Sequence, residues 1–340
     1  MDKQKQAFRV GSLAILLAIL LRMVCSGALG DRVALFSRPR LAGFLLYSET
    51  GREPAVTYAT IPTTAPAQPE QTPEPEPLPE QSVPLPTEPV VFTSEDMEYL
   101  EMYIQCRRDP DEQALLTKPL DWDLTGEEPT ILIIHTHGTE AYTPTTGSTY
   151  QEYGGAYRTD DDRYNMISIG DELTRLLEKA GLSVLHDRTP YDKDDYLDSY
   201  EQSRIAVKEH LREHPSIKMV LDLHRDAAEY EDGTQWATSA TVNGQKSAQL
   251  MLVVGTNATG LNHPNWESNL SIAEKLLVLM EKSHDGVTRY INLRGARFNH
   301  DLSVGAMIVE VGAAGNTHAE AMRAMPVLAE AIINLSLGSQ

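Results

Sequence analysis

Two histidines and a glutamate follow a short apolar segment of the chain, ILII at residues 131–134. They are His135, His137 and Glu140, in the stretch HTHGTE. Imidazole nitrogens and carboxylate oxygens bind divalent metals, and two imidazoles with one carboxylate are a common set in hydrolytic zinc sites. Because Gly138 lets the loop curl, His135 and Glu140 are predicted to bind one Zn²⁺ ion.

Two later apolar segments carry similar groups at their ends. VLDLHRDA contains His224, the predicted third zinc ligand, and MIVEVG contains Glu310. Glu310 is predicted to act as general base and acid, taking a proton from water and passing it to the leaving nitrogen. Arg225 follows His224; an arginine there more often forms a salt bridge, but it is also placed to hold a substrate carboxylate.

These side chains can meet only if a sheet brings the strand ends together, since open α/β sheets bind ligands beyond the carboxyl ends of their strands. Apolar runs predict strands at residues 131–134, 182–186, 217–224, 249–255 and 305–312. Amphipathic periodicity predicts helices at residues 93–107, 164–181, 198–214, 266–283 and 317–338. The alternation indicates an α/β domain over residues 93–340, with a mainly parallel central sheet and helices on both faces.

The segment before this domain has a different composition. Basic residues precede an apolar run that ends near residue 30, which predicts a cytoplasmic tip and a transmembrane anchor at 1–30. A signal peptide cleaved near residue 30 is the alternative. Residues 31–92 are predicted to be a membrane-proximal segment and a disordered, Pro- and Glu-rich linker that acts as a semi-rigid stalk. The domain is therefore expected outside the cell membrane, as part of a single-pass protein.

The bulk composition excludes several classes of function. The 340 residues carry a formal charge of -20, which argues against nucleic acid as a partner. The 2 cysteines, Cys25 and Cys106, form no framework for disulfides or a cysteine-rich zinc site, and the sequence suggests no role for Cys106. The motifs of serine hydrolases, of phosphate-binding loops and of HExxH zinc peptidases are missing from the sequence.

The motifs HTHGTE, VLDLHRDA and VEVGAAGNTHAEA, in this order, resemble those of the stage II sporulation protein P family, over about residues 120–338. The resemblance implies a membrane-anchored peptidoglycan hydrolase that acts during engulfment of the forespore. It implies a zinc-dependent N-acetylmuramoyl-L-alanine amidase, with a further endopeptidase activity on peptide cross-links. Expected partners are peptidoglycan and the sporulation proteins D and M.

Carried over by residue, the resemblance places the family's histidines at His135, His137 and His224, its carboxylate at Glu140 and its general base at Glu310. Which of the first two histidines binds the metal stays open at this point. His135 is favoured because it leaves the strand first, so His137 is assigned with Arg225 to substrate binding. The acidic run at residues 160–162 is an alternative source of the carboxylate ligand.

Two other functions stay open at the level of sequence. A zinc peptidase that acts on cross-links would use the same site, because the same chemistry hydrolyses either amide. A non-enzymatic wall-binding scaffold could keep the fold without the reaction.

Overall fold

The computed structural model describes residues 83–230 and 233–340. The predicted anchor at 1–30 and most of the predicted linker at 31–92 lie outside these ranges. Within them, no helix combines the length and the apolar character needed to cross a bilayer.

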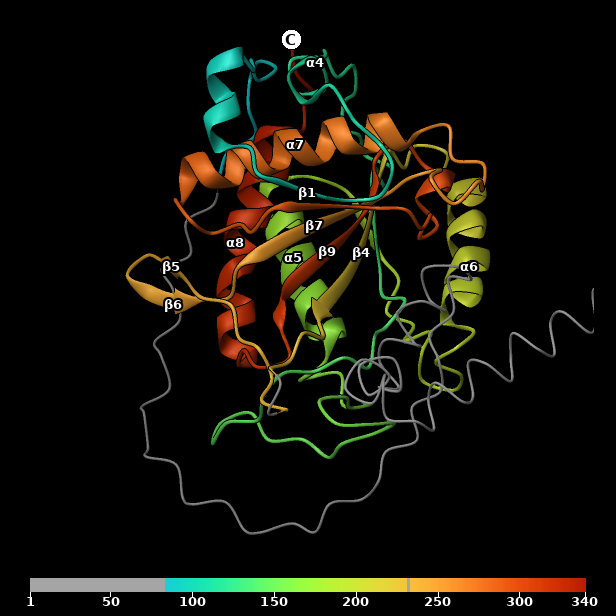
Figure 1. The fold of residues 1–340 in the computed structure, drawn as a ribbon, viewed down its shortest axis with the longest axis vertical. Helices are drawn as coiled ribbons and strands as arrows, with labels where there is room; N and C mark the ends of the chain where they lie inside the picture. The colour runs from blue at the N-terminus through green and yellow to red at the C-terminus, as the bar shows by residue number, and fades with distance from the viewer. Residues whose placement is uncertain (1–82, 231–232) are drawn as a thin grey trace, which may run out of the picture. The chain divides into compact units, whose positions relative to one another are not determined.

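The described residues form one α/β unit (Figure 1). Its strands are β1 (Met102–Gln105), β2 (Ile131–Ile134), β3 (Val184–His186), β4 (Met219–Asp226), β5 (Ala240–Val242), β6 (Gln245–Ser247), β7 (Leu250–Gly255), β8 (Ile291–Arg294) and β9 (Ala306–Ala313). Its α-helices are α4 (Glu112–Leu116), α5 (Met166–Ala180), α6 (Ser199–Glu213), α7 (Trp266–Ser283) and α8 (His318–Asn334). Two 3₁₀ helices, η1 (Ser94–Tyr99) and η2 (His300–Leu302), complete the set.

Seven strands form the main sheet of the described residues, in the order β1-β8-β7-β9-β4-β2-β3. Every neighbouring pair in it is parallel except β7 and β9, which are antiparallel. Strands β5 and β6 make a separate antiparallel pair. The predicted α/β class with a mainly parallel sheet is therefore confirmed.

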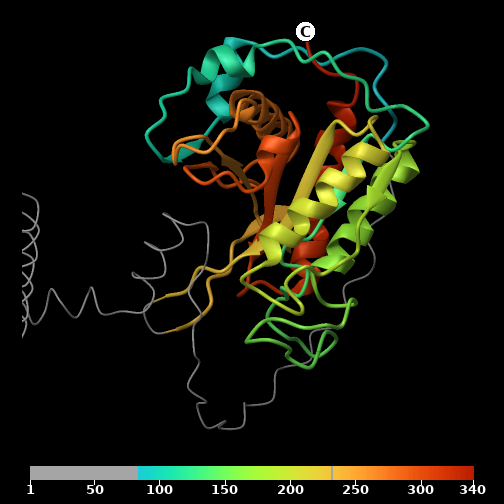
Figure 2. The ribbon, with the colours of Figure 1, turned by 90° about the vertical axis from the view of Figure 1, so that its right-hand side faces the viewer.

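Alternation along the central strands divides the core between two faces of the sheet. Ile131 and Ile133 of β2 face the larger cluster, which is built with residues of α5, α7 and α8. Leu132 and Ile134 face the opposite way, into a smaller cluster that contains Val207 of α6. Figure 1 shows α5 and α8 behind strands β7, β9 and β4, and Figure 2 turns the yellow helix α6 toward the reader. Helices thus cover both faces, as predicted.

Most predicted elements recur within a residue or two of their expected bounds. Helix α5 ends where predicted because Gly181 adopts a left-handed φ of 99°, which glycine alone adopts without strain, and so caps the helix. The predicted strands at 131–134, 182–186, 217–224, 249–255 and 305–312 correspond to β2, β3, β4, β7 and β9.

The predicted helix at 93–107 is wrong in its second half. Thr93 and Asp96 form a capping box that starts the 3₁₀ helix η1, so the start signal is genuine. The following residues instead form β1, in parallel register with β8 from Met102↔Ile291 to Gln105↔Arg294. Hydrogen bonds from a strand distant in sequence outweigh the local helical periodicity. Upstream, Val90 pairs with Ser339, so packing begins a few residues before the predicted boundary at 93.

Candidate metal centre

His135 lies on the opposite side of the sheet from the group it was expected to join. It continues the α5-facing side of β2, where it is fully buried against Gly170. Its Nε2 lies 2.8 Å from Nε2 of His186. Burial, together with the neighbouring His186, lowers the pKa of His135 to about 3. The alternation of side chains along β2 thus separates His135 from Glu140 and His224, the residues with which it was predicted to bind the metal.

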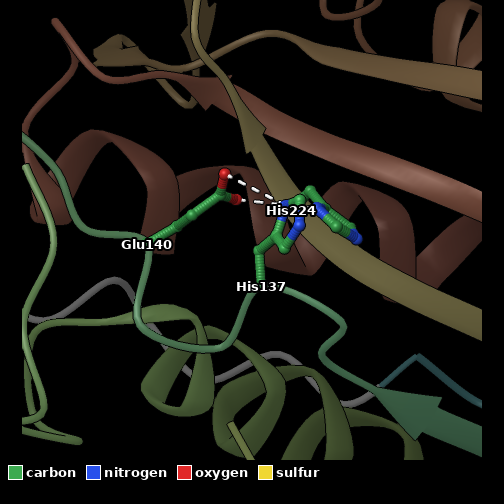
Figure 3. Close-up of side chains that lie close together, drawn as sticks. All are labelled: His137, Glu140 and His224. Carbon is green, nitrogen blue, oxygen red and sulfur yellow. Dashed lines mark ion pairs between the residues drawn. The ribbon is translucent and has the colours of Figure 1, made fainter. Parts of the chain in front are cut away.

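His137, Glu140 and His224 come together instead, and Figure 3 shows their side chains converging. Each offers one donor atom, and the three atoms lie within 4.8 Å of one another. The Nδ1 atoms of His137 and His224 lie 3.7 and 3.6 Å from the carboxylate oxygens of Glu140. All three residues are buried. We call these three residues the donor group.

The predicted alternative carboxylates at 160–162 do not join this group, which contains Glu140. Two of the predicted ligands, Glu140 and His224, thus lie close to each other, and the third residue beside them is His137 and not His135. His137 reaches the group because two more residues of loop carry it past the end of β2, away from the α5 side that holds His135. His137, which was predicted to bind substrate, lies among these three donor residues.

Arg225 contacts the carboxylate of Glu140 and holds it in place. Its backbone N–H donates to Glu140 Oε2 over 3.1 Å, and its Nη1 lies 3.5 Å from Oε1. Its Nε–H and Nη2–H donate to the backbone carbonyls of Ala141 and Tyr157. Arg225 is only 7% exposed, so its guanidinium is committed to the loop that carries Glu140. These contacts favour a structural role over the predicted binding of a substrate carboxylate.

The electrostatics of the donor group suit a cation. Burial by itself would raise the pKa of Glu140, but Arg225 and the two histidines hold it well below its ordinary value. Burial would lower the pKa of His224, but the carboxylates of Asp222 and Glu140 raise it well above the usual range. One imidazole between two buried carboxylates makes a negative environment that favours positive charge.

The donor group fits zinc. Two ligand atoms about 2.0–2.1 Å from a tetrahedral zinc ion are about 3.3 Å apart. The nitrogen–oxygen distances from His137 and His224 to Glu140, 3.7 and 3.6 Å, are slightly longer than this. Two histidines and one carboxylate leave a fourth position open, as catalytic zinc sites do. The residues present are therefore able to hold a zinc ion after small adjustments of their side chains.

Glu310 stands beside the donor group, because it is the direct partner of His224 in the register of β9 and β4. Paired residues on adjacent strands project from the same face, so both side chains leave the sheet together. Burial raises the pKa of Glu310 to about 8, against the opposing effect of His224. Its Oε2 is buried and has no hydrogen-bond partner in the described part of the chain, which leaves it free to take up a proton.

Three further residues contact the donor histidines and were missed at the level of sequence. Asp222 Oδ1 lies 3.0 Å from Nε2 of His224. Tyr196 stacks on the ring of His137 with centroids 4.6 Å apart, and Tyr200 meets that ring edge-on. Asp222 could have been predicted from the sequence Asp-Leu-His at 222–224, because residues two apart on a strand project from the same face. No pattern could reveal the tyrosines, because Tyr196 lies just before α6 and Tyr200 lies in its first turn.

Comparison with known proteins decides the family. A model of the family "Stage II sporulation protein P (SpoIIP)" matches residues 64–333. The chain belongs to the SpoIIP family. The resemblance that was recognised from HTHGTE and VLDLHRDA is thereby confirmed. SpoIIP from Bacillus subtilis (strain 168) is 29% identical to this member over 222 residues, which are 61% of this chain and 51% of that protein. The chain therefore spans about half the length of this curated SpoIIP relative.

Solved amidase structures resemble this SpoIIP chain distantly. The N-acetylmuramoyl-L-alanine amidase AmiC2 of Nostoc punctiforme is 13% identical, with a TM-score of 0.37, over 61% of this chain and 97% of that one. Ami1 from Mycobacterium smegmatis is 12% identical, with a TM-score of 0.38, over 62% of this chain and 96% of that one. Likenesses of this degree carry no residue roles over to this chain.

Proposed function

We propose that this SpoIIP-family chain is a zinc-dependent peptidoglycan hydrolase. It cleaves the amide between N-acetylmuramic acid and the L-alanine of the stem peptide, during engulfment of the forespore. The observation that carries the proposal is the buried donor group of His137, Glu140 and His224 with Glu310 beside it. Membership of a sporulation family supports the cell wall as the place of action.

The donor group would hold the zinc ion, with Arg225 keeping Glu140 in place. Zinc in such a site polarises an amide carbonyl and activates water. Glu310 Oε2 takes a proton from the attacking water and delivers it to the leaving nitrogen, so that the C–N bond breaks and an amine departs. Burial suits Glu310 to this task, because a carboxyl with a raised pKa can both accept and release a proton near neutral pH.

The location of the protein is part of the proposal. The apolar run at 1–30 would anchor the chain once in the cell membrane, with the hydrolase outside it, and the Pro- and Glu-rich linker would hold the hydrolase at a distance. The sporulation proteins D and M are its proposed partners.

Digestion of purified sacculi tests the reaction. The full chain, purified in detergent and loaded with zinc, is expected to release stem peptides with a free amino group on L-alanine and to leave lactyl carboxyl groups on the glycan, both detected by mass spectrometry. His224→Ala should release none, whereas Glu201→Gln, which changes an exposed carboxylate of α6, should match the wild type. Products with new peptide carboxyls between stem residues would make the chain an endopeptidase. If the wild type releases nothing, the enzymatic proposal fails and a wall-binding scaffold takes its place.

A further inference from the structure

We propose that Asp222 is a positioning residue for the metal centre, which holds His224 in the tautomer and orientation that a metal requires. The proposal rests on the donor group described above and adds a residue that does not itself belong to it. It is based on the imidazole of His224, which is buried and has a carboxylate next to each of its two ring nitrogens.

His224 has a carboxylate at each ring nitrogen. Nδ1 faces the donor group, 3.6 Å from Glu140 Oε2, and Nε2 lies 3.0 Å from Asp222 Oδ1. Nε2 is buried and makes no hydrogen bond with a described residue, so the close contact with the charged oxygen of Asp222 is the interaction that acts on it. Asp222 reaches Nε2 because it precedes His224 by two residues on β4, so both side chains leave the same face of the strand.

Asp222 is itself held firmly. The backbone N–H of Thr136 donates to Asp222 Oδ1 over 2.8 Å, and the hydroxyl of Thr136 donates to Oδ2 over 2.6 Å. Asp222 as a whole is 7% exposed, and Thr136 is fully buried. Both oxygens are therefore fixed, and the contact with His224 is made by a group that cannot turn away. Thr136 also gains a role, since it links the HTHGTE segment to the DLH segment.

The chemistry of imidazole explains the effect. A neutral histidine carries one proton, and the nitrogen without it is the metal ligand. A carboxylate beside Nε2 keeps the proton on that atom, so the lone pair of Nδ1 points into the donor group. The same carboxylate increases the basicity of the ligand, and removal of such a partner typically weakens metal binding 10–100-fold, by an order-of-magnitude rule.

The structure offers a matched control for this contact. Asp187 is a partly buried carboxylate, with its side chain 9% exposed, and it lies 2.8 Å from Nε2 of His210. It accepts a further hydrogen bond from the hydroxyl of Tyr191. This pair has the same chemistry as Asp222 and His224 but includes no member of the donor group. Its loss should affect the stability of the fold and leave the metal centre intact.

Zinc affinity of the full chain, measured by chelator competition, tests the proposal. Asp222→Asn keeps the shape and removes the charge, and its Kd for zinc should rise about 10–100-fold. Thr136→Val removes one hydrogen bond to Asp222 and should raise the Kd by a smaller factor. Asp187→Asn should keep the wild-type Kd. In ¹H–¹⁵N spectra of the zinc-loaded protein, the Nε2–H signal of His224 should be protected from exchange in the wild type and exchange freely in Asp222→Asn.

The outcomes separate this proposal from the one on which it rests. If the wild type binds zinc and Asp222→Asn binds it equally well with an unchanged Nε2–H signal, the role of Asp222 is refuted and the hydrolase proposal survives. If the wild type binds no zinc, both proposals fall together. Should Asp222→Asn not fold, as judged by circular dichroism, the Kd of Thr136→Val decides: a rise supports the role, and a wild-type value refutes it.

Discussion

His224 and Glu310 lie directly opposite each other on the adjacent parallel strands β4 and β9. Hydrogen bonds of the sheet fix this register, so the separation of the two side chains depends on the rigid core and not on a loop. His224 is buried and Glu310 is partly buried on the same face, so a donor of the proposed metal centre and the proposed proton carrier share one local environment. In the proposed mechanism, this arrangement would divide metal binding and proton transfer between neighbouring strands.

Replacement of the proton carrier should separate these tasks. Glu310→Gln keeps the size of the side chain but cannot take up a proton, so kcat on sacculi should fall by about 10²–10⁴-fold. Zinc content, measured by atomic absorption, should stay at the wild-type level, because Glu310 is not in the donor group. A variant with wild-type turnover would show that another residue carries the proton.

The two neighbouring histidines of HTHGTE should behave differently. His137→Ala removes a donor and should abolish stoichiometric zinc binding, whereas His135→Asn should bind zinc as the wild type does. His135→Asn should instead lower the free energy of unfolding by about 1–3 kcal/mol, because His186 loses its buried partner. Zinc titration and urea unfolding of both variants check this. Loss of zinc from the His135 variant alone would restore the assignment first drawn from the sequence.

Gly170 is expected to be essential for the packing of α5 on β2. A Cβ atom there would lie 2.5 Å from His186 Nε2 and 2.6 Å from His135 Nε2, closer than atoms can approach. Gly170→Ala should therefore destabilise the fold by about 1–3 kcal/mol, the usual cost of overpacking. Gly147→Ala is the matched control, since a Cβ at that position meets nothing within 4 Å. Equal urea midpoints for the two variants would contradict the described packing.

Acid should destabilise the protein partly through His318. Burial lowers the pKa of His318 to about 4, from an ordinary value near 6.5. Since the unfolded chain takes up the proton first, the contribution of His318 to stability is complete above about pH 6.5 and is lost as the pH falls through 4. The free energy of unfolding of His318→Asn should therefore decline less over this range than that of the wild type, by an amount on the order of 2 kcal/mol.

Chemical denaturation at a series of pH values measures this difference. His318 is hydrogen-bonded to Ser168 and lies outside the donor group, so zinc binding should not differ between the two proteins. Parallel pH profiles for the variant and the wild type would show that His318 takes up its proton equally readily in the folded and unfolded chains.

Most of the alternating strands and helices of the domain could be predicted from the sequence, because each has a recognisable local pattern of apolar residues. The amphipathic helix that ends at Gly181 makes its hydrogen bonds within a few residues, and the run ILII shows its burial in four consecutive apolar residues, although its partners β3 and β4 lie far along the chain. Strands β1 and β8 could not be read, because their sequences, MYIQ and INLR, include polar residues and form no apolar run. The helix expected across β1 shows how a pairing partner nearly 200 residues away overrides a local preference.

The sequence by itself determined the family, the class of fold and the chemical types of the site: two histidines and a carboxylate from one turn, with His224 and Glu310 from later strands. Only the tertiary structure decided which residues meet. Alternation along β2 directs His135 toward α5, and the loop then returns His137 and Glu140 to the face on which His224 and Glu310 stand. The spacing of the candidate residues along the chain gives only their order. The face of the sheet from which each side chain projects depends on how the strands and loops pack, and the spacing carries no information on that packing.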